Sequence, residues 1–243
     1  MSEAFVNENT ASKESVFRWK EADAYLFDID GTLLLSPDRT HRYALHRAML
    51  DVFGVETTID GIPYHGKTDP GIMRAALERL GIAEATINAK ITGALEVVRR
   101  EATEKADRFK PNVLPGIREV LELLRGHGKL LGVTSGNLEV VGWLKIKAAS
   151  LREYFAFGCF ADEHELREQI FQNGIQQVRT RLGPKASVCF VGDTPEDVRA
   201  AQKVGGRVIA VGTGIFKRED LLPHGPDALV TTCSELLALE PSK

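Results

Sequence analysis

Short apolar runs alternate with amphipathic stretches along most of the chain. Five runs predict buried strands, at residues 24–27, 130–134, 187–191, 208–211 and 228–231. Apolar residues at helical spacing predict helices between them, at residues 117–126, 138–149, 165–182 and 196–204. Strands that alternate with helices are typical of a parallel sheet covered on both faces, so we expect an α/β fold.

Residues 36–112 interrupt this alternation with a purely helical pattern. One helix face is expected around residues 45–53, Thr68-Asp69-Pro70 is expected to begin a second helix, and a third is expected at about residues 86–106. We therefore predict a discontinuous core domain, residues 21–35 and 113–243, with a helical domain inserted after its first strand. The polar residues 1–20 are expected to form a partly disordered N-terminal extension.

Composition excludes several classes of protein. The chain has 243 residues and a net charge of -3, which argues against a dedicated nucleic-acid binder. Its three cysteines are too few and too scattered for a disulfide framework or a zinc cluster. No apolar run is long enough to span a membrane, and the polar, acidic start does not suit a signal peptide. We expect a cytoplasmic protein that binds neither nucleic acid nor membrane.

Three of the predicted strands end in polar clusters. These clusters are Asp28-Ile29-Asp30, Ser135-Gly136-Asn137 and Gly192-Asp193. In open parallel sheets, ligands bind at the carboxyl ends of the strands, so the three clusters can converge on one site.

Each cluster also has a simpler interpretation when taken alone. Asp30-Gly31 is a common turn pair, Ser135 could be an ordinary helix N-cap, and the acids after Gly192 suit a helix N-terminus. However, two carboxylates just past a buried strand need a cation or hydrogen-bond donors. Magnesium, which bridges carboxylates and phosphate oxygens, is the natural partner.

Taken together, three segments resemble the haloacid dehalogenase (HAD) superfamily in its phosphatase branch. They are Asp28-Ile29-Asp30-Gly31-Thr32-Leu33, the strand that ends at Ser135, and Gly192-Asp193-Thr194-Pro195-Glu196-Asp197. The resemblance extends from about residue 22 to residue 238. It is strongest to phosphoglycolate-phosphatase-like and β-phosphoglucomutase-like members. It implies a Rossmann-like core, and the inserted helices look like the family's helical cap of the first type.

The resemblance implies a role for each acid. Asp28 matches the nucleophile that forms an aspartyl-phosphate, and Asp30 matches the general acid/base. Asp28, the main-chain carbonyl of Asp30, and Asp193 match the ligands of Mg²⁺. Asp197 matches a residue that orients the site's cation or the metal's surroundings.

The phosphoryl group would be held by the second cluster and by a cation. Ser135 matches the hydroxyl that holds this group, with Gly136 and Asn137 beside it, although Thr134 could replace Ser135. The family's usual lysine before the third strand is missing from residues 162–167, and Arg167 is our candidate substitute. Lys145 and Lys147 are less favoured, because their helix is expected to lead away from the site.

The inserted helices are expected to select the substrate. The loop of residues 64–69 resembles the family's specificity loop, in which Lys67 and Thr68 would contact an anionic substrate group; a simple helix N-cap turn is the alternative. His41, Arg42 and His46 also lie in this segment, and we expect at least two of them to be solvated.

The resemblance thus implies a magnesium-dependent phosphatase that hydrolyses a small phosphorylated metabolite, as a monomer or homodimer. The acid at Asp30 argues against a dehalogenase and against a phosphonate hydrolase. Two alternatives stay open: a sugar-phosphate mutase that uses the same aspartyl-phosphate, and a catalytically silent binding protein. The second is disfavoured because Asp28, Asp30 and Asp193 are all present.

Overall fold

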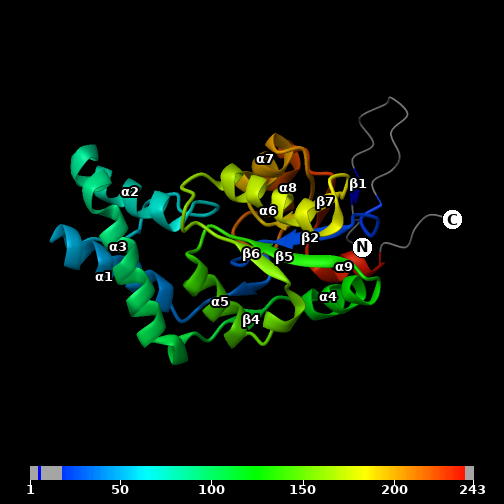
Figure 1. The fold of residues 1–243 in the computed structure, drawn as a ribbon, viewed down its shortest axis with the longest axis horizontal. Coiled ribbons are helices and arrows are strands. Elements are labelled where there is room, and N and C mark those ends of the chain that lie inside the picture. Colours follow the sequence, from blue (N-terminus) through cyan, green and yellow to red (C-terminus); the bar gives the residue numbers. More distant parts are fainter. Residues whose placement is uncertain (1–4, 7–17, 239–243) are drawn as a thin grey trace.

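Among the residues that the structure describes, seven strands form one sheet at the centre of the molecule (Figure 1). The computed structural model describes residues 5–6 and 18–238. In spatial order the strands are β1 (Phe5–Val6), β9 (Ala228–Val230), β8 (Arg207–Val211), β7 (Val188–Gly192), β2 (Ala24–Phe27), β5 (Leu130–Thr134) and β6 (Phe157–Cys159). Every neighbouring pair from β9 to β6 is parallel, and only β1 is antiparallel to its neighbour. The predicted α/β fold is confirmed.

Helices cover both faces of this sheet (Figure 1). One face packs against α4 (Ile117–Gly126), α5 (Glu139–Ala148) and α9 (Cys233–Ala238), and the other against α6 (Arg167–Leu182), α7 (Pro195–Lys203) and α8 (Arg218–Leu221). Tyr25 and Phe27 belong to the first core, and Leu26 between them belongs to the second. This alternation follows from the pleat of the strand. Full burial of an apolar side chain such as Leu26 or Phe27 contributes about 1.5–3 kcal/mol to the stability of the fold.

Three helices form a separate bundle beside the sheet (Figure 1). We call α1 (Thr40–Phe53), α2 (Asp69–Arg79) and α3 (Glu84–Glu104) the helical bundle. Its apolar faces form a cluster of buried residues that also includes Leu138 and Val141, at the start of α5. The two chain segments that connect it to the sheet pair with each other as β3 (Leu34–Leu35) and β4 (Asn112–Val113). The domain boundaries at residues 36 and 112 stay a prediction.

The sequence pattern missed the shortest elements. Strand β6 has only three residues, one of them Gly158, and is held by its pairing with β5. Short 3₁₀ helices lie at Ala106–Arg108, Arg152–Tyr154 and Leu222–His224. Most of the N-terminal extension expected to be partly disordered, residues 1–20, lies outside the described residues.

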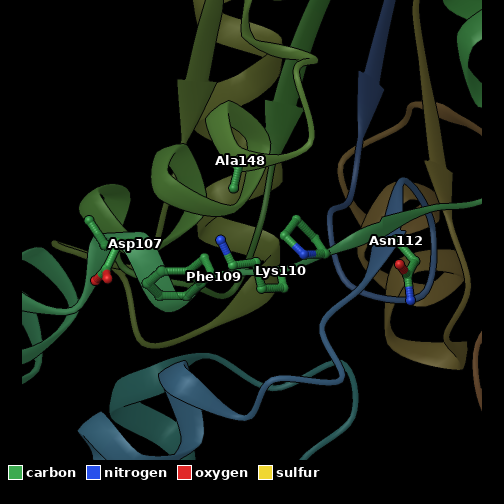
Figure 2. A pocket seen from close by; sticks show the side chains of 7 residues that line it. Asp107, Phe109, Lys110, Asn112 and Ala148 are labelled. Carbon is green, nitrogen blue, oxygen red and sulfur yellow. The ribbon is translucent and has the colours of Figure 1, made fainter.

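A small cavity of about 380 Å³ lies where the chain returns from the helical bundle to the sheet (Figure 2). Phe109, Lys110 and Asn112 line it on one side, and Ala148 lines it on the other. None of the predicted site residues lies there. Within residues 5–6 and 18–238, no helix is both long and apolar enough to cross a membrane.

Candidate active site

The carboxyl ends of β2, β5 and β7 bring the three polar clusters together. These strands are adjacent and parallel, with Phe27 in register with both Val133 and Val191. The residues that follow, Asp28, Ser135 and Asp193, are buried and line one cavity of about 830 Å³. The cavity lies between this edge of the sheet and the helical bundle, whose residues complete its lining.

Arg167 reaches the first acid of the site. It is the first residue of α6, and its guanidinium Nη2 lies 2.9 Å from Asp28 Oδ1. Both side chains are almost fully buried, so this charge pair is poorly screened by solvent. The cation that sequence reasoning selected is therefore beside Asp28.

Asp197 holds Arg167 in place. Its Oδ1 accepts hydrogen bonds from Arg167 Nε and Nη2, at 2.9 and 2.5 Å. Its Oδ2 accepts from the backbone N–H and the hydroxyl of Thr194, at 3.0 and 2.6 Å. Both oxygens are thus engaged by donors of this chain, so Asp197 is a poor candidate for a metal ligand despite its position.

The three acids around Arg167 carry more negative charge than this one arginine balances, which favours the binding of a further cation. Carboxylate oxygens of Asp28, Asp193 and Asp197 lie within 4.8 Å of one another among the described residues. Burial raises the pKa of Asp193 well above its ordinary value, and the nearby charge of Asp28 adds to this. Burial also raises the pKa of Asp28 to about 6, although Arg167 opposes the shift. Hard oxygen donors with this charge are the ligands that Mg²⁺ prefers.

Gly31 lets Asp193 approach the first cluster. Gly31 has a φ of +86°, and a Cβ atom there would lie 2.2 Å from Asp193 Oδ2. Asp193 Oδ1 accepts a hydrogen bond from Thr32 Oγ1 at 3.1 Å. A side chain at position 31 would therefore both strain the turn and displace the acid.

Ser135 and Asn137 form the second wall of the cavity. Ser135 Oγ accepts a hydrogen bond from Asn137 Nδ2 at 2.7 Å, and Asn137 Nδ2 also donates to Asp30 Oδ2 at 2.9 Å. Thr134, the alternative hydroxyl, is fully buried away from the cavity lining, and its Oγ1 has no hydrogen-bond partner within the described residues. Ser135 is the hydroxyl that faces the cavity.

Lys145, the cation that we favoured less, contacts the site even though it lies well along its helix. Its Nζ lies 2.6 Å from Asp30 Oδ2 and 2.8 Å from Asn137 Oδ1, and the side chain is buried. Side chains on a helix tilt toward its N-terminus, and residues four apart share a face. Lys145 therefore reaches back along α5, past Val141, to the polar cluster at the start of the helix. Lys147 is exposed on another face.

The loop before α2 rests directly on the sheet edge. A Cβ atom on Gly136 would lie 2.3 Å from the carbonyl oxygen of Lys67, so only glycine permits this approach. The side chain of Lys67 is exposed at the cavity. Thr68 Oγ1 instead donates to the carbonyl of Glu165 at 2.7 Å and accepts from Gly71 N–H as the α2 N-cap. Thr68 thus ties the loop to the core and is absent from the cavity lining.

The expectation that at least two of His41, Arg42 and His46 are solvated is wrong. All three are half-buried and have partners. His41 lies against Asp69 and Lys145, Arg42 pairs with Asp60, and His46 Nε2 accepts from the Ile59 N–H. The helical bundle folds its polar side chains onto itself and onto the site.

Comparison of the sequence with known families identifies the family of this chain. A model of haloacid dehalogenase-like hydrolases matches residues 22–205, which is most of the chain. The chain belongs to the haloacid dehalogenase-like hydrolase family.

Relatives and solved structures extend this match. The chain is 28% identical to a probable phosphatase, IndB, of Dickeya dadantii, over 87% of this chain and 90% of that protein. It is 27% identical to a phosphoglycolate phosphatase of Synechococcus elongatus, over 88% and 95%. The crystal structure of CbbY from Rhodobacter sphaeroides with phosphate aligns with a TM-score of 0.68 and 20% identity, over 89% of this chain and 96% of that one. At that identity the structural match supports the shared fold.

In this HAD-like hydrolase, sequence reasoning missed the contacts between helical bundle and core. Asp69 Oδ2 accepts from the Leu138 N–H at 2.8 Å, and Arg74 pairs with Glu165 at 2.6 Å. Pairs of this kind join residues that are far apart in the chain, so local patterns carry no signal for them. The spacing of Asn137, Val141 and Lys145 was the one available clue to the buried lysine.

Proposed function

We propose that this HAD-like hydrolase is a phosphatase that cleaves a phosphate monoester through an aspartyl-phosphate on Asp28. One observation carries the proposal: two acids, Asp28 and Asp30, line one cavity together with Ser135 and the buried Arg167, which pairs with Asp28. The named phosphatases among the relatives support the same reaction class.

The chain's own residues suggest a two-step reaction. Asp28 attacks phosphorus, and the bond from phosphorus to the ester oxygen breaks while Asp30 gives that oxygen a proton. Asp30 then takes a proton from water, which attacks the aspartyl-phosphate and releases inorganic phosphate. Arg167, Ser135 and backbone N–H groups of the 135–137 cluster balance the charge of the phosphoryl group.

Magnesium fits the negative charge of Asp28, Asp193 and Asp197, which is greater than the one nearby arginine, Arg167, can balance. Asp28, Asp193 and the main-chain carbonyl of Asp30 would hold it. When bound, it would neutralise negative charge on the phosphoryl group.

We also propose that the substrate is a small metabolite with a second anionic group. The cavity of about 830 Å³ suits a small molecule, and the helical bundle, acting as a cap, would cover it. Exposed cations of the cavity lining, among them Arg39 and Lys67, are placed to meet a carboxylate or second phosphate. The oligomeric state, monomer or homodimer, and the cytoplasmic location stay predictions.

A screen of phosphorylated metabolites with magnesium tests the proposal. We expect release of inorganic phosphate, with the highest kcat/KM for small esters that carry a carboxylate or a second phosphate. Conversion between sugar-phosphate isomers without phosphate release would instead identify a mutase. Binding of phosphate esters with no turnover would identify a silent protein and contradict the proposal.

Magnesium is expected to stabilise the chelator-treated protein more at pH 7.5 than at pH 5. Asp28 and Asp193 have raised pKa values, so they keep protons in the folded state that the unfolded chain releases, and stability falls as pH rises from about 4 towards 6. Magnesium replaces those protons. At about a hundred times its Kd it should raise Tm by roughly 5 °C at pH 7.5.

Thermal melts with and without magnesium measure this effect. Asp193→Asn is the matched variant, because it keeps the shape of the side chain and removes its charge. The shift should be lost in this variant. An equal shift in the wild type and in Asp193→Asn would place the metal elsewhere.

A further inference from the structure

Lys145 is a buried cation that the HAD-like reaction described above does not use. Its ammonium group has three N–H donors, and three acceptors surround it. They are Asp30 Oδ2 at 2.6 Å, Asn137 Oδ1 at 2.8 Å and His41 Nδ1 at 3.2 Å. No donor is left over for a phosphate group, so Lys145 differs in kind from Arg167 beside Asp28.

Asp30 has few other contacts that could set its orientation. Its side chain is 43% exposed and lines the cavity. Its Oδ2 accepts from Lys145 and from Asn137 Nδ2, and its Oδ1 has only a long contact of 3.5 Å with Ser36 Oγ. Because Lys145 also holds Asn137 through Oδ1, both strong contacts of Asp30 depend on this one lysine.

The third contact of Lys145 comes from the helical bundle. His41 Nδ1 accepts a hydrogen bond from the Lys145 ammonium group, so His41 Nε2 carries the ring hydrogen and donates to Asp69 Oδ2 at 3.0 Å. Asp69 is the first residue of α2, and the same Oδ2 accepts from the Leu138 N–H of the core. A continuous chain of hydrogen bonds thus connects α2 with Asp30 through His41 and Lys145.

We propose that Lys145 is a positioning residue that aims the Asp30 carboxyl group at the ester oxygen of the substrate, with His41 of the seated helical bundle holding Lys145 in place. The proposal rests on the phosphatase function above, and it assigns to Lys145 no contact with substrate. Its physical basis is preorganisation: a half-exposed carboxyl group is free to rotate, and a mobile acid transfers its proton less effectively. A buried lysine with all donors engaged removes that freedom.

The first test compares two esters with different leaving groups. The leaving group of p-nitrophenyl phosphate, p-nitrophenolate, is a stable anion that needs little proton transfer, whereas the phenolate of phenyl phosphate needs more. We expect Lys145→Met to lower kcat/KM about 100-fold for phenyl phosphate. For p-nitrophenyl phosphate we expect a loss of only about 10-fold. Lys147→Met, on the exposed face of the same helix, is the matched control and should leave both values unchanged.

The second test asks whether Lys145 acts through Asp30. In an Asp30→Asn background the acid is already absent, so adding Lys145→Met should cause no further loss of kcat/KM for p-nitrophenyl phosphate. If the two losses multiply, Lys145 acts independently of Asp30 and the proposal is overturned. Equal losses of kcat/KM for both esters in Lys145→Met would also overturn it.

His41→Gln provides a variant that leaves the core helix untouched. We expect it to show the same dependence on the leaving group, with a smaller loss, because only one of the three contacts of Lys145 changes. Absence of that dependence in a folded His41→Gln protein would remove the link to the helical bundle. If the wild type hydrolyses neither ester, the phosphatase proposal itself fails; if it hydrolyses both, only the role of Lys145 is at stake.

Discussion

Asp28→Asn should abolish phosphate release, with kcat at least about 10⁴-fold below the wild type on any ester that the wild type hydrolyses. An amide has nearly the shape of the carboxylate but cannot form the acyl phosphate. Asp28 is buried, lies against Arg167 and lines the cavity. Steady-state release of inorganic phosphate measures the loss.

The same variant also distinguishes loss of chemistry from loss of fold. Because burial raises the pKa of Asp28 to about 6, the carboxylate present at neutral pH lowers the stability of the folded state relative to the unfolded chain. A neutral amide removes this cost, and the chelator-treated variant should therefore melt no lower than the wild type at pH 7.5. Turnover retained at more than a few per cent in Asp28→Asn would refute the nucleophile.

Arg167→Ala should lower both activity and stability. Arg167 is the cation that touches Asp28 and also Asp197, and all three side chains are almost fully buried. Its removal takes away charge stabilisation of the phosphoryl group, for which we expect a loss in kcat of about 10³-fold. It also leaves two buried carboxylates unpaired, which should cost about 3 kcal/mol of unfolding free energy.

Two further variants separate the parts of this effect. Arg167→Lys keeps the charge but has one ammonium in place of the guanidinium fork, so it should recover part of the stability and less of the activity. Arg179→Ala changes an exposed arginine of the same helix and should leave both quantities unchanged. An unchanged rate in Arg167→Ala would show that another cation holds the phosphoryl group.

Local patterns predict the sheet and the helices around it well. The runs at residues 24–27 and 130–134 are strands with those bounds, and α2 begins one residue after its N-cap Thr68. Apolar periodicity and capping act over a few residues, so they can be read along the chain. Strand β6 has too few residues for a period, and its neighbour β5 decides its conformation.

The sequence by itself determined the acids of the site. Asp28, Asp30 and Asp193 follow buried strands, and strand order in a parallel sheet brings such residues to one edge. Arg167 is the predicted substitute for the lysine that the resemblance implies, and it begins the helix that leads into β7.

Only the tertiary structure decided which cation serves which acid. Lys145 and Asp30 are 115 residues apart, and their contact depends on how α5 lies against the sheet and on His41 from the helical bundle. Such contacts depend on the docking of whole helices. The packing of many side chains determines how the helices dock, and no periodic pattern in the sequence predicts it.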